Sequence, residues 1–564
     1  MTIPRPEHPN PQWQRGSWQN LNGPWQFGFN THPNESADSP GTPEILDREI
    51  LVPFCPESSL SGIAHTDFIS DVRYRREIEI GPAQLEGRVR LHFGAADYLT
   101  TVTVNGQQAG RHEGGYTGFC FDITALLRPG ANELRVHCWD DSRDPLVCRG
   151  KQSDRLESYS CLYTRTTGIW QTVWLEFVPQ DYIVSAAYEP DPENACLHIT
   201  AQVEGKAQFT ARALWQGREV GRATAVPCGK AVRLALPLSE THLWEVGKGG
   251  LYDLELLFGE DRVSSYFGLR SIELDGFKFL INGKSVFQRL ILDQGFYPDG
   301  IYTAPTKEAL EQDILLSMEA GFNGARFHEK VFEPLALYYA DLHGYLVWGE
   351  FPNWGGRDSD PALLHKFLPQ WCEAVARDHN HPSIVGWCPF NETSEEQFPE
   401  NIGVVYDMTR YLDPTRPCID TSGYCHVRTD IYCVHEYGQD PAQFASRYAP
   451  FIEGDSFYDH KQDDRKAQRY GGQAMFVSEY GGIAWNAGGG WGYGQAPKTE
   501  EEYKTRYKAL TDTLLDHPKM FAFCYTQLTD VEQEKNGVLT YGRVPKFELS
   551  FFHGVNTRKA AIED

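Results

Sequence analysis

Two glutamates stand directly after very apolar runs, Glu392 after IVGWCPFN and Glu479 after AMFVS. Short apolar runs bounded by turn signals are typical of buried strands, so both carboxyl groups are expected where a strand ends. Two carboxyl groups on a common rim suit the hydrolysis of a glycosidic bond, because one protonates the leaving oxygen and the other attacks the anomeric carbon or activates water. The competing interpretation is that each glutamate is an ordinary rim or ion-pair residue.

Other polar side chains are expected at the same rim. They also follow strand-like runs and are Asp293, His328, Glu350, Asn391, His435 and Tyr437. A carboxyl group beside apolar side chains tends to have a raised pKa, so it can stay protonated and serve as an acid. This mostly acidic set is therefore the candidate site.

The elements that must position these residues begin near residue 271, where strand-like runs alternate with helical patterns. The strand candidates are 286–292, 322–327, 345–350, 384–390, 418–423, 431–437, 474–480 and 520–527. The helix candidates are 306–321, 332–344, 362–378 and 501–516. Repeated βα units of this number predict a (β/α)8 TIM barrel over residues 271–564, with its active site at the carboxyl ends of the strands.

The first 270 residues show period-two alternation with Gly and Asn turns. Runs at 72–80, 88–93, 100–106, 132–139 and 171–177 predict an antiparallel β-sandwich over residues 1–180. A second set of strand-like runs predicts an immunoglobulin-like β-sandwich over residues 181–270. The fold class is therefore multidomain, with β domains ahead of an α/β barrel.

Charge and cysteine usage narrow the partners. The formal net charge of −25 repels nucleic acid, which is not expected as a partner. The 13 cysteines lack C-x-x-C spacing, which indicates free buried thiols and a reducing cytoplasm. The start MTIPRPEHPNPQWQ predicts no signal peptide, and no apolar run is long enough to cross a membrane. The missing phosphate loop disfavours a nucleotide-dependent enzyme.

Several sequence motifs resemble those of glycoside hydrolase family 2, and they occur in the family's order along nearly the whole chain. NHPSIVGWCPFNE (380–392) resembles the family's acid/base word, and FVSEYGG (476–482) its nucleophile word. GFNGARFHEK (321–330) and QLTDVEQEKNGVLTYGRVPK (527–546) are similar to the stretches after its second and eighth barrel strands. SWQNLNGPWQF (17–27) and TGIWQTVWLE (167–176) resemble its sugar-binding jelly roll, so the resemblance implies a jelly-roll β-sandwich for residues 1–180.

The resemblance implies a retaining exo-glycosidase in which Glu392 is the general acid/base and Glu479 the nucleophile, with carboxyl groups about 5–5.5 Å apart. Asn391 is implied to bind the sugar 2-hydroxyl. Arg326 is implied to keep the nucleophile ionised, since an adjacent cation lowers a carboxylate pKa. Tyr437 is implied to donate a hydrogen bond to the nucleophile; the alignment there is loose by a residue, so His435 is a competitor.

Further candidates for contacts with the sugar are two hydroxyl ligands, His328 and Asp293, and five rings, Trp348, Trp354, Trp485, Trp491 and Tyr525. His328 has a structural histidine as its alternative role. Trp485 and Trp491 belong to the Gly-rich stretch 481–494, which we interpret as a flap over the sugar, with a plain surface loop as the alternative.

Departures from the family bear on the sugar. Glucuronidases of the family carry an Asn-x-Lys word where this chain has Glu534, Lys535 and Asn536, so a uronic acid is not expected. The large β-galactosidases carry a Glu-x-His magnesium pair after strand 3, where this chain has GEFPNWGG (349–356). We therefore expect no metal and no cofactor.

The substrate expected is a glycoside or oligosaccharide, and β-galactosidase is the first choice among activities. β-Galactofuranosidase and α-L-arabinosidase are alternatives within the family, because hydroxyl orientation is recognised by loop geometry that the sequence does not specify. A non-catalytic carbohydrate-binding protein is the alternative from another class. A homo-oligomer is possible.

Overall fold

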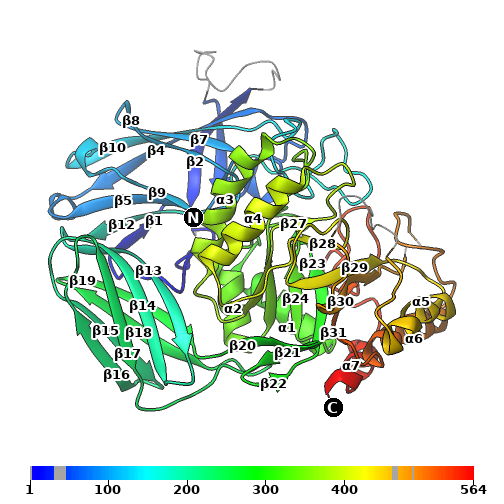
Figure 1. Ribbon diagram of the computed structural model, residues 1–564. Helices are drawn as coiled ribbons and strands as arrows, with labels where there is room; N and C mark the ends of the chain where they lie inside the picture. The colour runs from blue at the N-terminus through cyan, green and yellow to red at the C-terminus, as the bar shows by residue number, and fades with distance from the viewer. Residues whose placement is uncertain (1–2, 31–45, 460–467, 486–487, 564) are drawn as a thin grey trace.

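The computed structural model describes residues 3–30, 46–459, 468–485 and 488–563. Two β-sandwiches lie one above the other at the left of Figure 1, and the α/β barrel lies to their right. The expected boundaries near residues 180 and 270 fall in the short links between β12 and β13 and between β19 and β20. We keep them as proposed domain limits.

The first sandwich packs a six-stranded sheet, in the order β3-β2-β4-β10-β7-β8, over a four-stranded sheet, in the order β1-β12-β5-β9. Along β10, Leu134, Val136 and Cys138 alternate into the core between the sheets. Its strands are β1 Trp18–Asn20, β2 Gly23–Asn30, β3 Arg48–Val52, β4 Asp71–Ile80, β5 Arg88–Phe93, β6 Ala96–Asp97, β7 Leu99–Val104, β8 Gln107–Glu113, β9 Phe119–Asp122, β10 Gly130–Trp139, β11 Gly168–Ile169 and β12 Val173–Val178.

The second sandwich packs a three-stranded sheet, β13-β14-β17, over a four-stranded sheet, β16-β15-β18-β19. The same alternation gives it a separate core, to which β14 contributes Leu197, Ile199, Ala201 and Val203. Its strands are β13 Tyr182–Asp191, β14 Cys196–Glu204, β15 Phe209–Trp215, β16 Arg218–Ala225, β17 Ala231–Pro237, β18 Leu251–Phe258 and β19 Asp261–Gly268.

The barrel has seven parallel strands in one sheet, in the order β26-β25-β24-β23-β31-β30-β29. Between β26 and β29 lies the chain at 418–422, where Cys418 bridges Trp387 in parallel and β28 pairs in parallel with β27. The strands are β23 Gln288–Asp293, β24 Gly324–Phe327, β25 Leu346–Glu350, β26 Ile384–Cys388, β27 Phe390–Asn391, β28 Thr421–Ser422, β29 Ile431–Glu436, β30 Ala474–Gly481 and β31 Met520–Thr526. The expected TIM barrel is confirmed.

Helices cover the outside of the barrel, as in Figure 1. They are α1 Lys307–Glu319, α2 Pro334–His343, α3 Leu363–Asp378, α4 Pro399–Leu412, α5 Pro441–Glu453, α6 Glu500–Leu515 and α7 Leu549–Asn556. A small antiparallel sheet precedes the barrel and consists of β20 Ile272–Asp275, β21 Lys278–Ile281 and β22 Lys284–Ser285.

The fifth barrel strand is shorter than the expected 418–423. Asp420 lies inside this run, and its carboxylate accepts the backbone N–H groups of Thr421, Val427 and Arg428 at 2.6–2.8 Å. A side chain that satisfies nearby backbone donors competes with the strand ladder. Only Thr421–Ser422 therefore pair as a strand. Helices α4, α5 and α7 were missing from the expected set.

The chain between β10 and β11, residues 140–167, leaves the first sandwich and packs on the barrel. We call it the jelly-roll arm. The N–H groups of Arg149 and Gly150 donate to the carbonyl of Trp354 at 2.8 and 3.0 Å, and the N–H of Arg357 donates to the carbonyl of Pro145 at 2.7 Å. The arm therefore carries residues of the first domain to the loops after the barrel strands.

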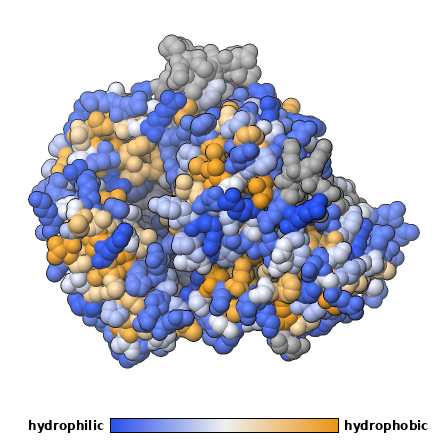
Figure 2. Space-filling model, viewed as in Figure 1, coloured by the Kyte–Doolittle hydropathy of each residue, from blue (hydrophilic) through white to orange (hydrophobic). Residues whose placement is uncertain are grey.

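The surface is largely polar. Figure 2 shows hydrophilic residues over most of the visible face, with hydrophobic residues in scattered groups between them. All 13 cysteines are free thiols, and most are buried. In the described part of the chain, no helix is both long enough and apolar enough to span a bilayer.

Candidate active site

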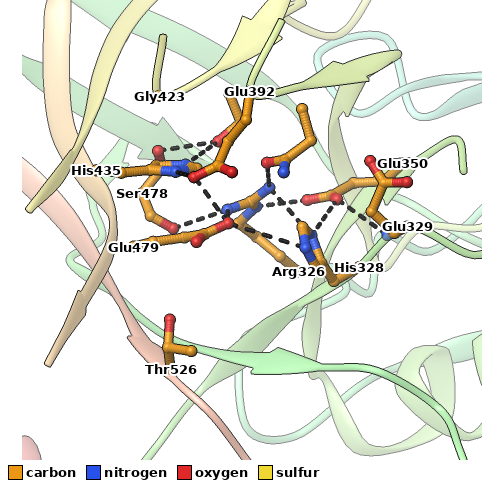
Figure 3. Close-up of polar contacts among 12 residues, drawn as sticks. Arg326, His328, Glu329, Glu350, Glu392, Gly423, His435, Ser478, Glu479 and Thr526 are labelled. Carbon is orange, nitrogen blue, oxygen red and sulfur yellow. Dashed lines mark hydrogen bonds and ion pairs between the residues drawn. The ribbon is translucent and has the colours of Figure 1, made fainter. Parts of the chain in front are cut away.

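The centre of the candidate site is Arg326, which lies on β24 next to its last residue and is 1% exposed. Its Nη1 lies 2.8 Å from Oε1 of Glu479, its Nη2 donates to Oδ1 of Asn391 at 2.9 Å, and its Nε is paired with Glu350. Figure 3 shows the guanidinium between Glu350 on one side and Glu479 on the other. Burial alone would lower the pKa of Arg326, but Glu350 and Glu479 raise it well above the ordinary value.

Glu479 lies on β30 and receives donors from several elements. Besides Arg326, the hydroxyl of Tyr437 donates to Oε2, and Nε2 of His435 lies 3.4 Å from Oε1. Burial would raise the pKa of this carboxyl, but the nearby His435, Arg326 and His328 outweigh burial and hold it below the ordinary value. Glu479 is therefore kept ionised, as a nucleophile must be.

Glu392 directly follows β27 and has a left-handed backbone conformation, with φ of 50°. Its N–H donates to the carbonyl of Ser422 at 2.9 Å, which holds this turn against the fifth strand. Non-glycine residues held at positive φ cost free energy and cluster at functional sites. The turn aims the carboxylate at Nδ1 of His435, 2.6 Å from Oε1, as Figure 3 shows.

His435 lies between the two glutamates. Its Nε2 is 3.0 Å from the hydroxyl of Ser422, which in turn donates to the hydroxyl of Ser478 at 2.9 Å. Burial would raise the pKa of Glu392, but the hydrogen bond and charge of His435 outweigh burial and lower it. The histidine therefore couples the protonation of the two carboxyl groups.

The two carboxylates are close. Ligand atoms of Glu392, His435 and Glu479 all lie within 4.8 Å of one another, in the one group of the described residues that could hold a metal ion. The carboxylate oxygens already accept N–H and O–H donors from His435, Arg326 and Tyr437, so we assign no metal to this group. Short separation suits direct attack by one carboxylate, since a site that activates water holds its carboxyl groups about 6.5–9.5 Å apart.

Behind this pair, His328 and Glu350 hold Arg326 in place. Nδ1 of His328 lies 2.9 Å from Oε2 of Glu350, and its Nε2 lies 3.9 Å from Oε1 of Glu479. Burial lowers the pKa of His328 well below its ordinary value, and the nearby Lys151 and Arg326 lower it further. A neutral His328 donates from one nitrogen and leaves the other free to accept.

Among the candidate rings, Trp354 reaches the site, and Trp491 packs on the arm and the loop after β31. Trp354 donates from Nε1 to the carbonyl of Asn391 at 3.2 Å. Trp491 donates from Nε1 to the carbonyl of Ser160 in the jelly-roll arm, and its N–H donates to the carbonyl of Gln533 at 2.9 Å. The stretch 481–494 is thus tied to the arm and to the loop after β31; residues 486–487 lie outside the described residues.

The other candidate rings do not reach the site. Trp348 is buried inside the barrel, where its Nε1 donates to Oε1 of Gln288 at 2.9 Å. The ring of Tyr525 is fully buried, and its hydroxyl lies 3.0 Å from that of Tyr503 on α6. Trp485 packs edge-on against Phe547, with ring centroids 5.0 Å apart. These three side chains stabilise the barrel and its helices.

Asp293 ends β23, and its side chain accepts a hydrogen bond within its own loop. Its Oδ1 accepts the N–H of Gly295 at 2.9 Å. Burial, together with the nearby Asp313, raises the pKa of Asp293 to about 6. We find no contact that brings Asp293 to either catalytic candidate within the described chain, so its expected sugar contact has no support.

Sequence reasoning missed several residues of the site. Tyr493 stacks on Tyr437, with centroids 3.5 Å apart and rings 5° from parallel. Tyr424 forms a hydrogen bond that helps to lower the pKa of Glu392. Glu350 was noticed as a strand end, but nothing in the sequence gave it a role. Because these contacts join separate loops, no local spacing could have signalled them.

The loop after β31 replaces the Asn-x-Lys word of glucuronidases with an acidic residue. Glu534 is 2% exposed. The hydroxyl of Tyr163, in the jelly-roll arm, donates to its Oε2, and Asn536 donates to its Oε1 at 2.9 Å. Burial raises the pKa of Glu534, and the neighbouring Glu479 raises it further, while Tyr163 and Lys151 act in the opposite direction.

Two β-sandwiches ahead of a (β/α)8 barrel, with two close glutamates at the ends of its fourth and seventh strands, define a retaining glycoside hydrolase. The chain belongs to glycoside hydrolase family 2. The family's TIM barrel domain matches residues 306–520, and its sugar binding domain matches residues 63–175. The expected family and enzyme class are confirmed.

Relatives are distant. The chain is 24% identical to a beta-glucuronidase of Paenibacillus borealis over 94% of this chain and 95% of the relative. It is also 24% identical to a putative beta-glucuronidase of Formosa agariphila and to a beta-galactosidase of Pseudoalteromonas haloplanktis, over 61% and 74% of this chain. The chain spans 43% and 40% of the lengths of those two relatives.

Solved structures show the same fold. A beta-glucuronidase of Ruminococcus gnavus superimposes with a TM-score of 0.79 over 99% of both chains, at 18% sequence identity. Another, from an uncultured Clostridium, gives a TM-score of 0.75 over 96% of this chain at 20% identity. At such identities the likeness establishes the fold, and the sugar must be argued from the site.

Proposed function

We propose that the protein removes terminal sugars by double displacement, with Glu479 as nucleophile and Glu392 as acid/base. The observation that carries this proposal is the close pair of carboxylates, with oxygens within 4.8 Å and His435 between them. In the first step, an oxygen of Glu479 bonds to the anomeric carbon while Glu392 gives its proton to the departing glycosidic oxygen. In the second step, Glu392 takes a proton from water, and this water displaces Glu479.

Proton supply for the first step involves His435. In the resting site the pKa of Glu392 is lowered, which suits its role as base in the second step. The first step requires a proton on Glu392, and Nδ1 of His435 lies 2.6 Å from Oε1. When the proton of this hydrogen bond lies on Oε1, rotation of the carboxyl group presents it to the departing glycosidic oxygen. Glu392 and His435 together therefore act as the acid.

Exo action and a neutral sugar are also proposed. The jelly-roll arm contacts Trp354 and Glu534, so it covers one side of the site and supports action on chain ends. We propose β-galactoside as the substrate, because buried Glu534 stands where a glucuronidase carries its carboxylate-binding word. A carboxylate beside that position repels a uronate and accepts a sugar hydroxyl. β-Galactofuranosides and α-L-arabinosides satisfy the same argument.

β-Glucuronidase is the second candidate activity, and the names of two relatives and of the superimposed structures favour it. We also propose a cytoplasmic location, which the 13 free cysteines support.

A substrate screen tests the proposal. Nitrophenyl β-galactopyranoside, β-glucuronide, β-galactofuranoside and both α-L-arabinosides are compared by kcat/KM, with Glu479→Gln alongside. We expect turnover of a neutral glycoside, at least about 100-fold above the glucuronide, and loss of that turnover in the variant. A preference for the glucuronide would overturn the neutral-sugar proposal, and turnover that survives in Glu479→Gln would overturn the catalytic assignment.

A further inference from the structure

The jelly-roll arm brings a buried lysine to the active site. Lys151 is 5% exposed, although it belongs to the first domain and not to the barrel. Its Nζ lies 3.5 Å from the ring centroid of Trp354, the tryptophan whose Nε1 donates to the carbonyl of Asn391. The ammonium group therefore lies beside the backbone that carries the acid/base.

The charge of Lys151 is not matched by a direct partner. Within the described residues, its Nζ has no carboxylate within 4.0 Å, and it is not among the fully buried polar atoms that lack a partner, so it still meets solvent in the site. Other buried cations of the protein do have partners: Lys330 donates to the carbonyls of Gly295 and Tyr302, at 2.5 and 2.8 Å. An ammonium that meets solvent between otherwise buried side chains of the site is available to an acceptor that arrives with a ligand.

The surroundings keep Lys151 charged. Burial would lower its pKa, but Cys161, Glu329, Glu479 and Glu392 outweigh burial and raise it. Lys151 in turn helps to lower the pKa of Glu392. The lysine is thus close enough to both catalytic glutamates to interact with them electrostatically, and a cation–π contact holds its ammonium over the ring of Trp354.

The charges around Lys151 select the kind of ligand. The charges of Glu329, Glu392 and Glu479 raise the pKa of Lys151. Lys151 in turn lowers the pKa of the buried Glu534. An anionic ligand at the ammonium would face these carboxyl groups. A hydroxyl group accepts from the ammonium and donates to a neighbouring carboxylate, so it satisfies both. One oxygen of Glu329 is buried without a partner in the described structure, while the other accepts the N–H of Trp354 at 3.0 Å.

We propose that Lys151 binds a ring hydroxyl of the terminal sugar beyond its second carbon, so that the jelly-roll domain forms part of the sugar-binding subsite. This inference rests on the proposed function. The anomeric carbon must lie between Glu392 and Glu479, and the arm approaches over Trp354 from the jelly-roll side of the barrel. Lys151 is then a specificity-determining residue, and the 3- and 4-hydroxyls are the groups it selects.

The experiment compares Lys151→Met with wild type on the neutral nitrophenyl glycoside that the screen identifies and on its 3-deoxy and 4-deoxy analogues. Methionine keeps the length of the side chain and its contact with Trp354. We expect kcat/KM to fall about 10- to 100-fold on the full sugar, as for a hydrogen bond to a charged group. On the deoxy analogue that lacks the bound hydroxyl, we expect a fall of less than about 3-fold. Lys151→Arg should recover part of the loss.

Stability separates this role from a structural one. Lys151→Met breaks no ion pair or hydrogen bond of the described residues, so its Tm should stay close to that of wild type. The matched control Lys330→Met breaks two hydrogen bonds to carbonyls, so it should lower the Tm and show no dependence on the sugar hydroxyls.

Three outcomes would overturn the inference: an equal loss on the full sugar and both deoxy analogues, no loss on any substrate, or a loss confined to the glucuronide. The proposed function fails separately, because its failure appears in wild type as no turnover, or in Glu479→Gln as undiminished turnover. Active wild type, inactive Glu479→Gln and unaffected Lys151→Met would leave the proposed function standing and remove the role of Lys151.

Discussion

The surroundings of the two glutamates differ, although one histidine contacts both. Glu479 is held by donors from β24 and from the end of β29, and its side chain is 6% exposed. Glu392 is bound by His435 and Tyr424, its side chain is 16% exposed, and it lies in a left-handed turn after β27. One carboxylate is fixed by a buried network, and the other stands at the edge of it.

The difference matches the two tasks of a retaining mechanism. A nucleophile must stay ionised and aligned with the anomeric carbon, which suits the fixed contacts of Glu479 with Arg326 and Tyr437. An acid/base must lose a proton in one step and regain one from water in the next, which suits the more accessible Glu392. The comparison predicts that changes at the two positions have different kinetic signatures.

The largest effect is expected for Glu479→Gln. An amide does not attack the anomeric carbon, so kcat should fall by at least about 10⁴-fold on every substrate, whatever its leaving group. Initial rates with the best nitrophenyl glycoside measure this. Arg326 retains its pairing with Glu350, so the folded state should persist, and an unchanged circular dichroism spectrum serves as the control. A loss that varies strongly with the leaving group would contradict the assignment.

A smaller effect, dependent on the leaving group, is expected for Glu392→Gln. General acid catalysis contributes about 10²–10⁴-fold. We expect that loss with a methyl glycoside, whose leaving oxygen needs a proton, and a smaller loss in the first step with a dinitrophenyl glycoside, which departs without one. Azide should restore turnover of the dinitrophenyl substrate and yield a glycosyl azide. If both substrates lose equally and azide has no effect, Glu392 is not the acid/base.

The barrel and its two glutamates could be predicted from the sequence because each depends on local pattern. An apolar run followed by a polar residue marks the carboxyl end of a buried strand, and seven of the eight expected runs form strands of the main barrel sheet. The fifth run failed in part, because Asp420 binds the backbone that follows it. Trp348 and Tyr525 were misplaced, because proximity to a strand end does not specify which way a ring points.

The far side of the site could not be predicted from the sequence. Lys151 and Tyr163 come from the jelly-roll arm, and the contact of Tyr163 with Glu534 joins residues 371 positions apart. No spacing rule connects positions in two domains. The same limit applies to the sugar. The absence of the Asn-x-Lys motif disfavours a uronate substrate, but the contacts of the residues that replace it can be seen only when the arm is placed against the barrel.

The position of His435 between the glutamates gives the smallest predicted effect and the sharpest test of the comparison. In His435→Asn, Glu479 loses the first of the positive charges that lower its pKa, so this pKa rises and the acid limb of kcat/KM moves to higher pH. The same change removes the hydrogen bond and the charge that lower the pKa of Glu392, so this pKa rises too and the alkaline limb also moves to higher pH. The whole bell should shift to higher pH, by about one pH unit on each limb.

Tyr437→Phe is the matched control for this profile. It removes one hydrogen bond to Glu479 and leaves the contact between His435 and Glu392 intact, so only the acid limb should move. The profiles of kcat/KM for the three proteins decide the matter. An alkaline limb that stays in place in His435→Asn would show that Glu392 holds its proton without the histidine, and the acid would then be a single glutamate. An alkaline limb that moves in both variants would show that the two carboxylates share one environment, against the division drawn between them.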